Sequence, residues 1–452
     1  MTGTLAVIEP ATEAVLEEIP RAGAAEVDAA VAAARAAYPG WRALAPGDRA
    51  EKLRALVAAM EAAHEELSVL ESRNAGKPIS SARGEIGMAI ATIRYYAGAP
   101  ERLLGDTIPV AGGQAFTFRE PMGVVGLITP WNFPLAIACW KMGPALAAGN
   151  TVVLKPAELT PLTAVRFGAL ADEVLGGGIV NVVVGPGRVC GQRLVEHADV
   201  AKIAFTGSTE VGRSIAAAAA QTIKRVTLEL GGKSPNIVFE DADVELAAAS
   251  APWAVFDNAG QDCCARSRIF VQERVLDAFM SRLETEVKAI RVGQPLDEQT
   301  EMGPLISADQ LSTVSSFVPD GAPVAFRGSA PDGPGYWFPP TVLCPVAPDD
   351  RAVREEIFGP VAAVIPFKDE DEAIRLANDT IYGLSGSIWT RDGGRALRVA
   401  RAVEAGNLSL NSNSSVRVTT PFGGFKQSGY GRELGPHALD AYTEVKTVFY
   451  AT

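Results

Sequence analysis

Residues 151–187 read TVVLKPAELTPLTAVRFGALADEVLGGGIVNVVVGPG, and this stretch decides the fold. Its apolar runs at 151–154 and 179–184 have the length and composition of buried strands. The segment between them is typical of a helix that Thr160 caps and Pro161 begins. Strand, helix and strand in this order predict a parallel α/β sheet.

The alternation continues beyond this stretch. Apolar runs at 202–205 and 226–230 extend the first sheet. A second alternating region follows Cys263 and predicts a second α/β domain, with strand candidates at 269–272, 361–366, 385–389 and 408–410. Segments 111–120 and 445–451 are strand-like but remote from both regions, so they predict a small appended β arm.

Helical patterning dominates the first hundred residues. Asp48 is expected to cap a helix whose apolar face runs from Leu53 to Leu70, and Gly76 and Pro78 are expected to end it. Such a helix more often covers a sheet than carries chemistry.

Composition limits the possible functions. The chain has 452 residues, of which 48% are apolar, and roughly 150 residues per domain predicts two or three structural units. A net charge of -12 argues against binding to nucleic acid or to an anionic membrane. Five unpatterned cysteines predict neither a disulfide framework nor a zinc site, and favour a reducing cytoplasm. Residues 1–10 lack the pattern of an export signal, and no 18-residue apolar window predicts a membrane span.

Three segments carry candidate nucleotide-binding signals. KPAE at 155–158 ends a predicted strand, where a lysine and a carboxylate can hydrogen-bond ribose hydroxyls and the carboxylate repels a 2'-phosphate; a solvated loop is the alternative. FTGSTEVG at 205–212 runs from a strand into a helix N-terminus that can face a pyrophosphate, or is an ordinary capped helix start. GPG at 185–187 is a weak signal, because Cys190 stands where a third glycine is needed.

Three further segments carry candidate catalytic groups. GQDCCA at 260–265 places Cys263 in a polar break, although buried inert cysteines are the alternative. LELGGKSP at 228–235 puts Glu229 before a flexible turn, as a general base or as a partner of Lys233. PWNFP at 130–134 fixes Asn132 as an oxyanion donor or as a turn residue. The three histidines stand in no notable setting, which disfavours a cysteine protease.

These motifs together resemble the NAD(P)-dependent aldehyde dehydrogenase family over essentially the full length. The resemblance also includes EEIFGPV at 355–361, PFGGFKQSG at 421–429 and the spacing of 263 - 229 = 34 residues between the expected base and nucleophile. It implies a Rossmann-like cofactor-binding domain (1–102 and 122–231), a second α/β catalytic domain (232–427), and an oligomerisation arm with a C-terminal tail (103–121 and 428–452). The expected assembly is a homodimer or a homotetramer.

The resemblance also implies roles for individual residues. Cys263 would be the nucleophile that forms a thiohemiacetal and then a thioester, Glu229 the base for hydrolysis, and Asn132 the oxyanion donor together with the Cys263 N–H. Lys155 and Glu158 would hold the adenosine ribose of NAD. The whole implied cofactor-binding set is Ile128, Thr129, Pro130, Trp131, Lys155, Glu158, Gly187, Phe205, Gly207, Ser208, Gly212, Leu230, Glu356 and Phe358. No metal is required by this chemistry.

The aldehyde is less clearly indicated. Phe133, Trp140 and Phe422 would line its tunnel or simply pack the core, and the small polar residues 411–415 would leave the tunnel wide. Asp262 beside the nucleophile favours a distal ammonium, as in 4-aminobutyraldehyde, unless it pairs with Arg266 or Arg268 or points away. Asp257 departs from the aromatic residue that is common at this position in the family.

Three other functions remain alternatives. One is broad specificity for aliphatic and aromatic aldehydes. Transfer of the thioester to coenzyme A is disfavoured because it would make Glu229 superfluous. A catalytically silent structural protein is disfavoured because Cys263, Glu229 and Asn132 are all present.

Overall fold

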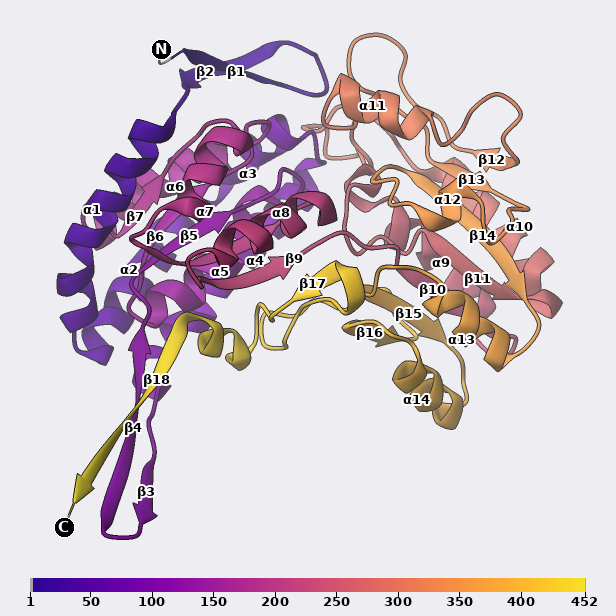
Figure 1. Cartoon of the computed structure of the whole chain (residues 1–452). Helices are drawn as coiled ribbons and strands as arrows, with labels where there is room; N and C mark the ends of the chain where they lie inside the picture. The colour runs from indigo at the N-terminus through magenta and orange to yellow at the C-terminus, as the bar shows by residue number, and fades with distance from the viewer. Residues whose placement is uncertain (1–2, 452) are drawn as a thin grey trace.

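The computed structural model describes residues 3–451, so residues 1, 2 and 452 at the ends of the predicted units lie outside it. Two α/β lobes stand side by side, and a β arm projects from the first of them (Figure 1). The C-terminus lies at the end of the arm, and the hairpin of β1 (Thr4–Ile8) and β2 (Val15–Pro20) lies at the opposite end of the molecule. No helix in residues 3–451 is long and apolar enough to cross a membrane.

The first lobe contains a six-stranded sheet in the order β17-β9-β8-β5-β6-β7. Its strands are β5 (Val124–Ile128), β6 (Thr151–Lys155), β7 (Val180–Val182), β8 (Val200–Thr206), β9 (Arg225–Glu229) and β17 (Gly429–Tyr430). All neighbours are parallel except β17, which pairs antiparallel with β9. The predicted parallel sheet is therefore confirmed. The two residues of β17 lie in this sheet, whereas the sequence groups 428–452 with the arm.

The second lobe contains a seven-stranded sheet in the order β12-β13-β14-β11-β10-β15-β16. Its strands are β10 (Pro235–Val238), β11 (Arg268–Gln272), β12 (Val324–Arg327), β13 (Thr341–Leu343), β14 (Val361–Phe367), β15 (Ser385–Trp389) and β16 (Asn407–Leu410). Only the β12–β13 pairing is antiparallel. The four strand candidates predicted in this region are all present.

The arm is a three-stranded antiparallel sheet in the order β18-β4-β3. It combines β3 (Thr107–Val110), β4 (Gly113–Pro121) and the C-terminal β18 (Thr443–Ala451). The β segments predicted near 111–120 and 445–451 thus pair with each other, although more than 300 residues separate them in sequence.

Helices cover both sheets. Those of the first lobe are α1 (Ala24–Ala43), α2 (Pro46–Ala62), α3 (His64–Ala75), α4 (Ile79–Ala97), α5 (Pro134–Ala147), α6 (Leu162–Leu175), α7 (Gln192–Glu196) and α8 (Thr209–Ala220). Those of the second lobe are α9 (Val244–Val255), α10 (Leu276–Ala289), α11 (Ala308–Ser315), α12 (Arg351–Arg354), α13 (Glu370–Asn378) and α14 (Gly393–Ala402).

Two predicted helix starts are wrong. The run beginning near Asp48 is two helices that meet at Ala63, and α2 starts with Pro46, which leaves Asp48 in the first turn rather than at the cap. Thr160 does not cap α6, because its hydroxyl donates to the Trp131 carbonyl at 3.2 Å. The hydroxyl thus donates to a carbonyl distant in sequence instead of accepting from a backbone N–H of α6, and it ties the start of α6 to the PWNFP turn.

Helix α5 is buried along its whole length and packs closely on α4. Gly143 permits this approach: a Cβ there would lie 2.5 Å from Cδ2 of Tyr96. Tyr96 cannot move aside, because its ring is fully buried and its hydroxyl donates to the Gly435 carbonyl at 2.8 Å.

Gly143→Ala is therefore expected to destabilise the fold. Alanine in a helix normally gains about 1 kcal/mol over glycine, but overpacking a rigid core costs about 1–3 kcal/mol, so the net change is a loss. Gly87→Ala is the matched control on α4, where a Cβ meets nothing within 4 Å and the helix preference alone acts. Denaturant midpoints measure both variants, and a stabilised Gly143→Ala would contradict this packing.

Candidate active site

The parallel strands of the first lobe deliver the predicted groups to one edge of its sheet. Asn132 follows β5, Gly207 follows β8, and Glu229 is the last residue of β9. The carboxyl ends of parallel strands point the same way, which is where ligands bind in open α/β sheets. Cys263 comes from the second lobe, shortly before β11 begins, and meets this edge across the junction of the lobes.

A strained turn precedes Cys263, the predicted nucleophile. Asn258, Ala259 and Gly260 have consecutive positive φ values of 50°, 54° and 71°. Left-handed backbone costs free energy at residues other than glycine, so tertiary contacts must hold it. Gln261 supplies them: its side chain donates to the Asn258 carbonyl at 3.0 Å and accepts from the Ile306 N–H at 2.9 Å.

Cys263 is half-buried and lines both cavities, whereas Cys264 is buried in the wall of the larger one. This accessibility favours a reactive thiol at Cys263 over an inert one. A hydrogen bond with Cys264, and then burial, raise the pKa of the Cys263 thiol well above its ordinary value. Asp262 joins the pair to form a group of possible metal ligands, with ligand atoms within 4.8 Å of one another in the described part of the chain.

Asn132 connects the two lobes at the nucleophile. Its side-chain Nδ2 donates to the Gln261 carbonyl at 3.0 Å, and its own carbonyl accepts from Asn258 Nδ2 at 3.0 Å and from Lys77 Nζ at 2.8 Å. These contacts aim the amide N–H groups of Asn132 at the Cys263 turn. The residue is thus more than a surface turn residue, since it is 3% exposed and bonded across the junction.

Glu229 faces the larger cavity with neither carboxylate oxygen hydrogen-bonded. It does not pair with Lys233, whose ammonium is also buried without a partner. Burial, and then the charge of Glu433, raise the pKa of Glu229 well above its ordinary value. A Cβ at Gly423 would lie 2.9 Å from Oε1 of Glu229, so a glycine leaves room for this carboxylate.

Lys141 and Glu433 form a buried ion pair beside Glu229 that the sequence did not predict. Lys141 Nζ bonds Glu433 and donates to Thr206 Oγ1 at 2.7 Å, and both members of the pair are essentially inaccessible to solvent. A single lysine in the otherwise apolar helix α5 was the available signal. Its partner lies 292 residues away, beyond any local pattern.

A smaller cavity of about 250 Å³ gathers many of the residues assigned to the cofactor. Glu356 accepts from the Gly232 N–H at 2.8 Å, and burial raises the pKa of Glu356 to about 7. The ring of Phe358 meets Trp131 edge-on at 5.1 Å. From the predicted set, the cavity is lined by Pro130, Trp131, Gly207, Ser208, Leu230, Glu356 and Phe358.

The other predicted cofactor residues lie around this cavity or farther along the sheet edge. Ser208 caps α8 by accepting from the Val211 N–H at 3.4 Å, so the capped helix start and the cavity wall are the same feature. Lys155 ends β6 and is buried, and Glu158 pairs with Arg21 at 3.2 Å. The remaining members, Ile128, Thr129, Gly187, Phe205 and Gly212, do not line the small cavity.

The larger cavity, of about 680 Å³, contains every residue assigned to the aldehyde. Phe133, Trp140 and Phe422 line it, and the last two rings meet at 5.2 Å. The residues 411–415 also lie in its wall. The aromatic side chains therefore serve both the cavity and the packing behind it.

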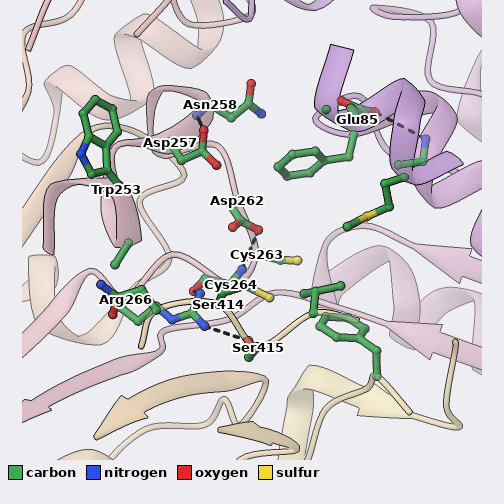
Figure 2. Close-up of a pocket in the computed structure, with 18 of the residues that line it drawn as sticks. Glu85, Trp253, Asp257, Asn258, Asp262, Cys263, Cys264, Arg266, Ser414 and Ser415 are labelled. Carbon is green, nitrogen blue, oxygen red and sulfur yellow. Dashed lines mark hydrogen bonds between the residues drawn. The ribbon is translucent and has the colours of Figure 1, made fainter. Parts of the chain in front are cut away.

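Asp262 points into this cavity and accepts from the Cys264 N–H at 2.9 Å (Figure 2). It forms no ion pair with Arg266, which bonds Ser387, Ser415 and the Cys264 carbonyl instead. Asp257 lies beside Trp253 in the same wall and lines the cavity. From the sequence, Asp257 was identified only as a departure from the residue common in the family.

Known proteins resemble this chain in both fold and sequence. The chain matches the aldehyde dehydrogenase family over residues 1–448. It is 45% identical to an aldehyde dehydrogenase of Emericella nidulans, covering 99% of this chain and 92% of that protein. It is 42% identical to betaine aldehyde dehydrogenase 1 of rice, covering 98% of this chain and 91% of that protein. The NAD+ complex of an aldehyde dehydrogenase from Bacillus cereus superposes with a TM-score of 0.97 at 42% identity, covering 99% of this chain and 93% of that one. The chain belongs to the aldehyde dehydrogenase family.

Proposed function

We propose that this chain oxidises an aldehyde to its carboxylate with NAD+, through a thioester on Cys263. The observation that carries the proposal is the position of Cys263, which lines both the cavity of the expected cofactor and that of the expected aldehyde. A nucleophile at this junction can hold a carbonyl carbon within reach of a hydride acceptor.

The chemistry assigns a separate task to each residue. The Cys263 thiol loses its proton to solvent, the thiolate adds to the carbonyl carbon, and Asn132 Nδ2 with the Cys263 N–H stabilises the alkoxide that forms. NAD, held by the residues of the smaller cavity, would supply the hydride acceptor. Glu229 then takes a proton from the water that hydrolyses the thioester. Because its pKa is raised, Glu229 becomes a base as pH rises through that pKa, so hydrolysis should accelerate with pH.

Several observations support NAD as the cofactor. Thr129 Oγ1 is buried without a partner directly before the cavity-lining Pro130, and the start of α8 faces the cavity with the positive end of its dipole. Lys155 and Glu158 stand at the end of the neighbouring strand β6, in position for a ribose. The Bacillus cereus relative binds NAD+.

The larger cavity supports an aminoaldehyde such as 4-aminobutyraldehyde. Its two cations are already occupied, Lys77 by Glu85 and Arg266 by serine and carbonyl oxygens. The carboxylates of Asp257 and Asp262 line the cavity, where Asp257 is exposed and Asp262 is half-buried, and desolvation raises the pKa of both. A distal ammonium in the cavity would be attracted by these two carboxylates. Without that preference, the same aromatic cavity would serve aliphatic and aromatic aldehydes broadly.

The β arm supports assembly into a homodimer or a homotetramer. Sedimentation velocity would distinguish either assembly from a monomer. The strands of the arm expose large apolar side chains, and burying them against a second copy of the chain would be favourable. These side chains are Ile108, Val110, Phe118, Val445, Val448, Phe449 and Tyr450. A cytoplasmic location remains a proposal from the cysteine content alone.

Glu229→Gln tests the two-step chemistry. The variant should release about one equivalent of NADH per site in a burst and then stall, since only hydrolysis needs the base. Stopped-flow absorbance measures the burst, and Cys263→Ala is the control that should show none. Normal turnover without a burst would remove Glu229 from this role.

Glu158 tests the cofactor. The wild-type protein should have a higher kcat/KM with NAD than with NADP. Glu158→Gln should reduce the ratio of the two kcat/KM values about tenfold, equivalent to roughly 1.4 kcal/mol. The reason is that the variant no longer repels the 2'-phosphate of NADP. Glu173→Gln, on the exposed side of α6, is the matched control and should change nothing. A wild-type preference for NADP would refute the assignment.

Asp257 and Asp262 test the substrate. Wild type should have a higher kcat/KM for 4-aminobutyraldehyde than for butanal, and Asp257→Asn and Asp262→Asn should each reduce that ratio about tenfold. Butanal serves as the internal control, because it carries no charge for either carboxylate to bind. Equal wild-type values, or an unchanged ratio in Asp262→Asn, would rule out the aminoaldehyde.

A further inference from the structure

Three buried charged side chains beside the Asn132 turn have no part in the chemistry described so far. Glu71 lies on α3, Lys77 in the α3–α4 connection and Glu85 on α4, and all three are at most 7% exposed. Lys77 and Glu85 also line the larger cavity. Burying this much charge is costly unless it is paired and hydrogen-bonded.

Lys77 holds the backbone of Asn132. Its ammonium bonds Glu85, donates to the Asn132 carbonyl at 2.8 Å, and lies 4.5 Å from the centre of the Phe133 ring. Asn258 donates to the same carbonyl from the opposite lobe at 3.0 Å. The Asn132 peptide is thus fixed from both sides.

The two glutamates replace the missing cap of α5. Phe133 precedes this helix and offers no side-chain acceptor. Glu71 Oε1 accepts from the Leu135 N–H and Glu85 Oε1 from the Ala136 N–H, each at 3.4 Å. Because free N–H groups at a buried helix start need acceptors, these carboxyl groups fix where α5 begins and where the preceding Asn132 lies.

Lys77 and Glu85 form the ion pair of this cluster. Burial, and then the neighbouring charge of Glu85, raise the pKa of Glu71 well above its ordinary value. A neutral Glu71 still accepts from Leu135 and from the Thr163 hydroxyl, which lies 2.6 Å from its Oε2. Glu85 is therefore the carboxylate that neutralises the buried Lys77 ammonium.

We propose that Lys77 and Glu85 are positioning residues for the oxyanion donor, acting through the Asn132 backbone. This inference rests on the proposed role of Asn132. With the carbonyl fixed, the Asn132 side chain can only turn about its own bonds to direct Nδ2 at the alkoxide. Without the pair, the peptide can rotate and the donor is displaced, and a displacement of about 1 Å can cost about 100-fold in rate.

The decisive variant is the double substitution Lys77→Met/Glu85→Met. Lys77→Met alone leaves the buried Glu85 carboxylate without its cation and should lower the thermal unfolding midpoint. The double variant removes both charges and should recover most of the lost stability. The NADH burst rate should fall about 10- to 100-fold in both variants. The Kd for NAD should change less than about threefold, because the pair does not line the smaller cavity. The pair does line the larger cavity, so the KM for aldehyde is measured beside the burst rate to separate binding from chemistry.

Glu66→Met/Arg166→Met is the control. It removes another ion pair of the first lobe by the same kind of double substitution, but this pair lines neither cavity, so its burst rate should stay within about twofold of wild type. A stable double variant with a wild-type burst rate would overturn the proposal. So would losses of burst rate, aldehyde binding and NAD binding in equal proportion, which indicate general collapse of the site.

Asn132→Ala separates this inference from the proposed function on which it rests. A burst abolished in Asn132→Ala but normal in the double variant overturns the positioning role alone. A normal burst in Asn132→Ala overturns the role of Asn132 itself, and the positioning role with it.

Discussion

Two hydrogen bonds between Asn132 and the Asn258–Gln261 turn join the lobes at the point on which the site depends. Each lobe supplies part of the predicted catalytic set: β9 of the first sheet ends in Glu229, and the second lobe brings Cys263. The strained backbone at Asn258 and Ala259 is tolerated because these cross-lobe bonds, with the anchored Gln261 side chain, stabilise it. The geometry of the nucleophile is therefore a property of the junction rather than of either lobe.

The site is built largely from carboxyl groups that burial keeps from ionising freely. The pKa values of Glu229 and Glu356 are both raised by burial, and Lys141 pairs with Glu433 rather than with the base. A base that meets no hydrogen-bond donor of its own can accept a proton from water without first breaking a bond. Because its carboxylate lacks hydrogen-bond partners, the burial of Glu229 also lowers the stability of the folded state, a common consequence of placing a functional group in a dry cavity.

The fold was largely predictable because its central strands are buried on both faces and read as continuous apolar runs. The caps assigned to Asp48 and Thr160 failed because the local pattern did not show Pro46 starting a helix, or Trp131 taking the Thr160 hydroxyl. The roles of Cys263, Glu229 and Asn132 were predicted from a set of motifs in a fixed order, not from any one of them. The pairs Lys77–Glu85 and Lys141–Glu433 were missed because their meaning depends on partners that only tertiary folding brings together.

The two-residue strand β17 has a structural consequence. It pairs with β9 at Glu229 and Leu228, and the same segment then carries Glu433 and continues into β18 of the arm. The predicted base thus lies on a strand whose edge is covered by the C-terminal segment, and the same segment ends in the projecting arm (Figure 1). One continuous stretch of chain, residues 429–451, therefore pairs with the strand of Glu229 at its start and with the arm at its end.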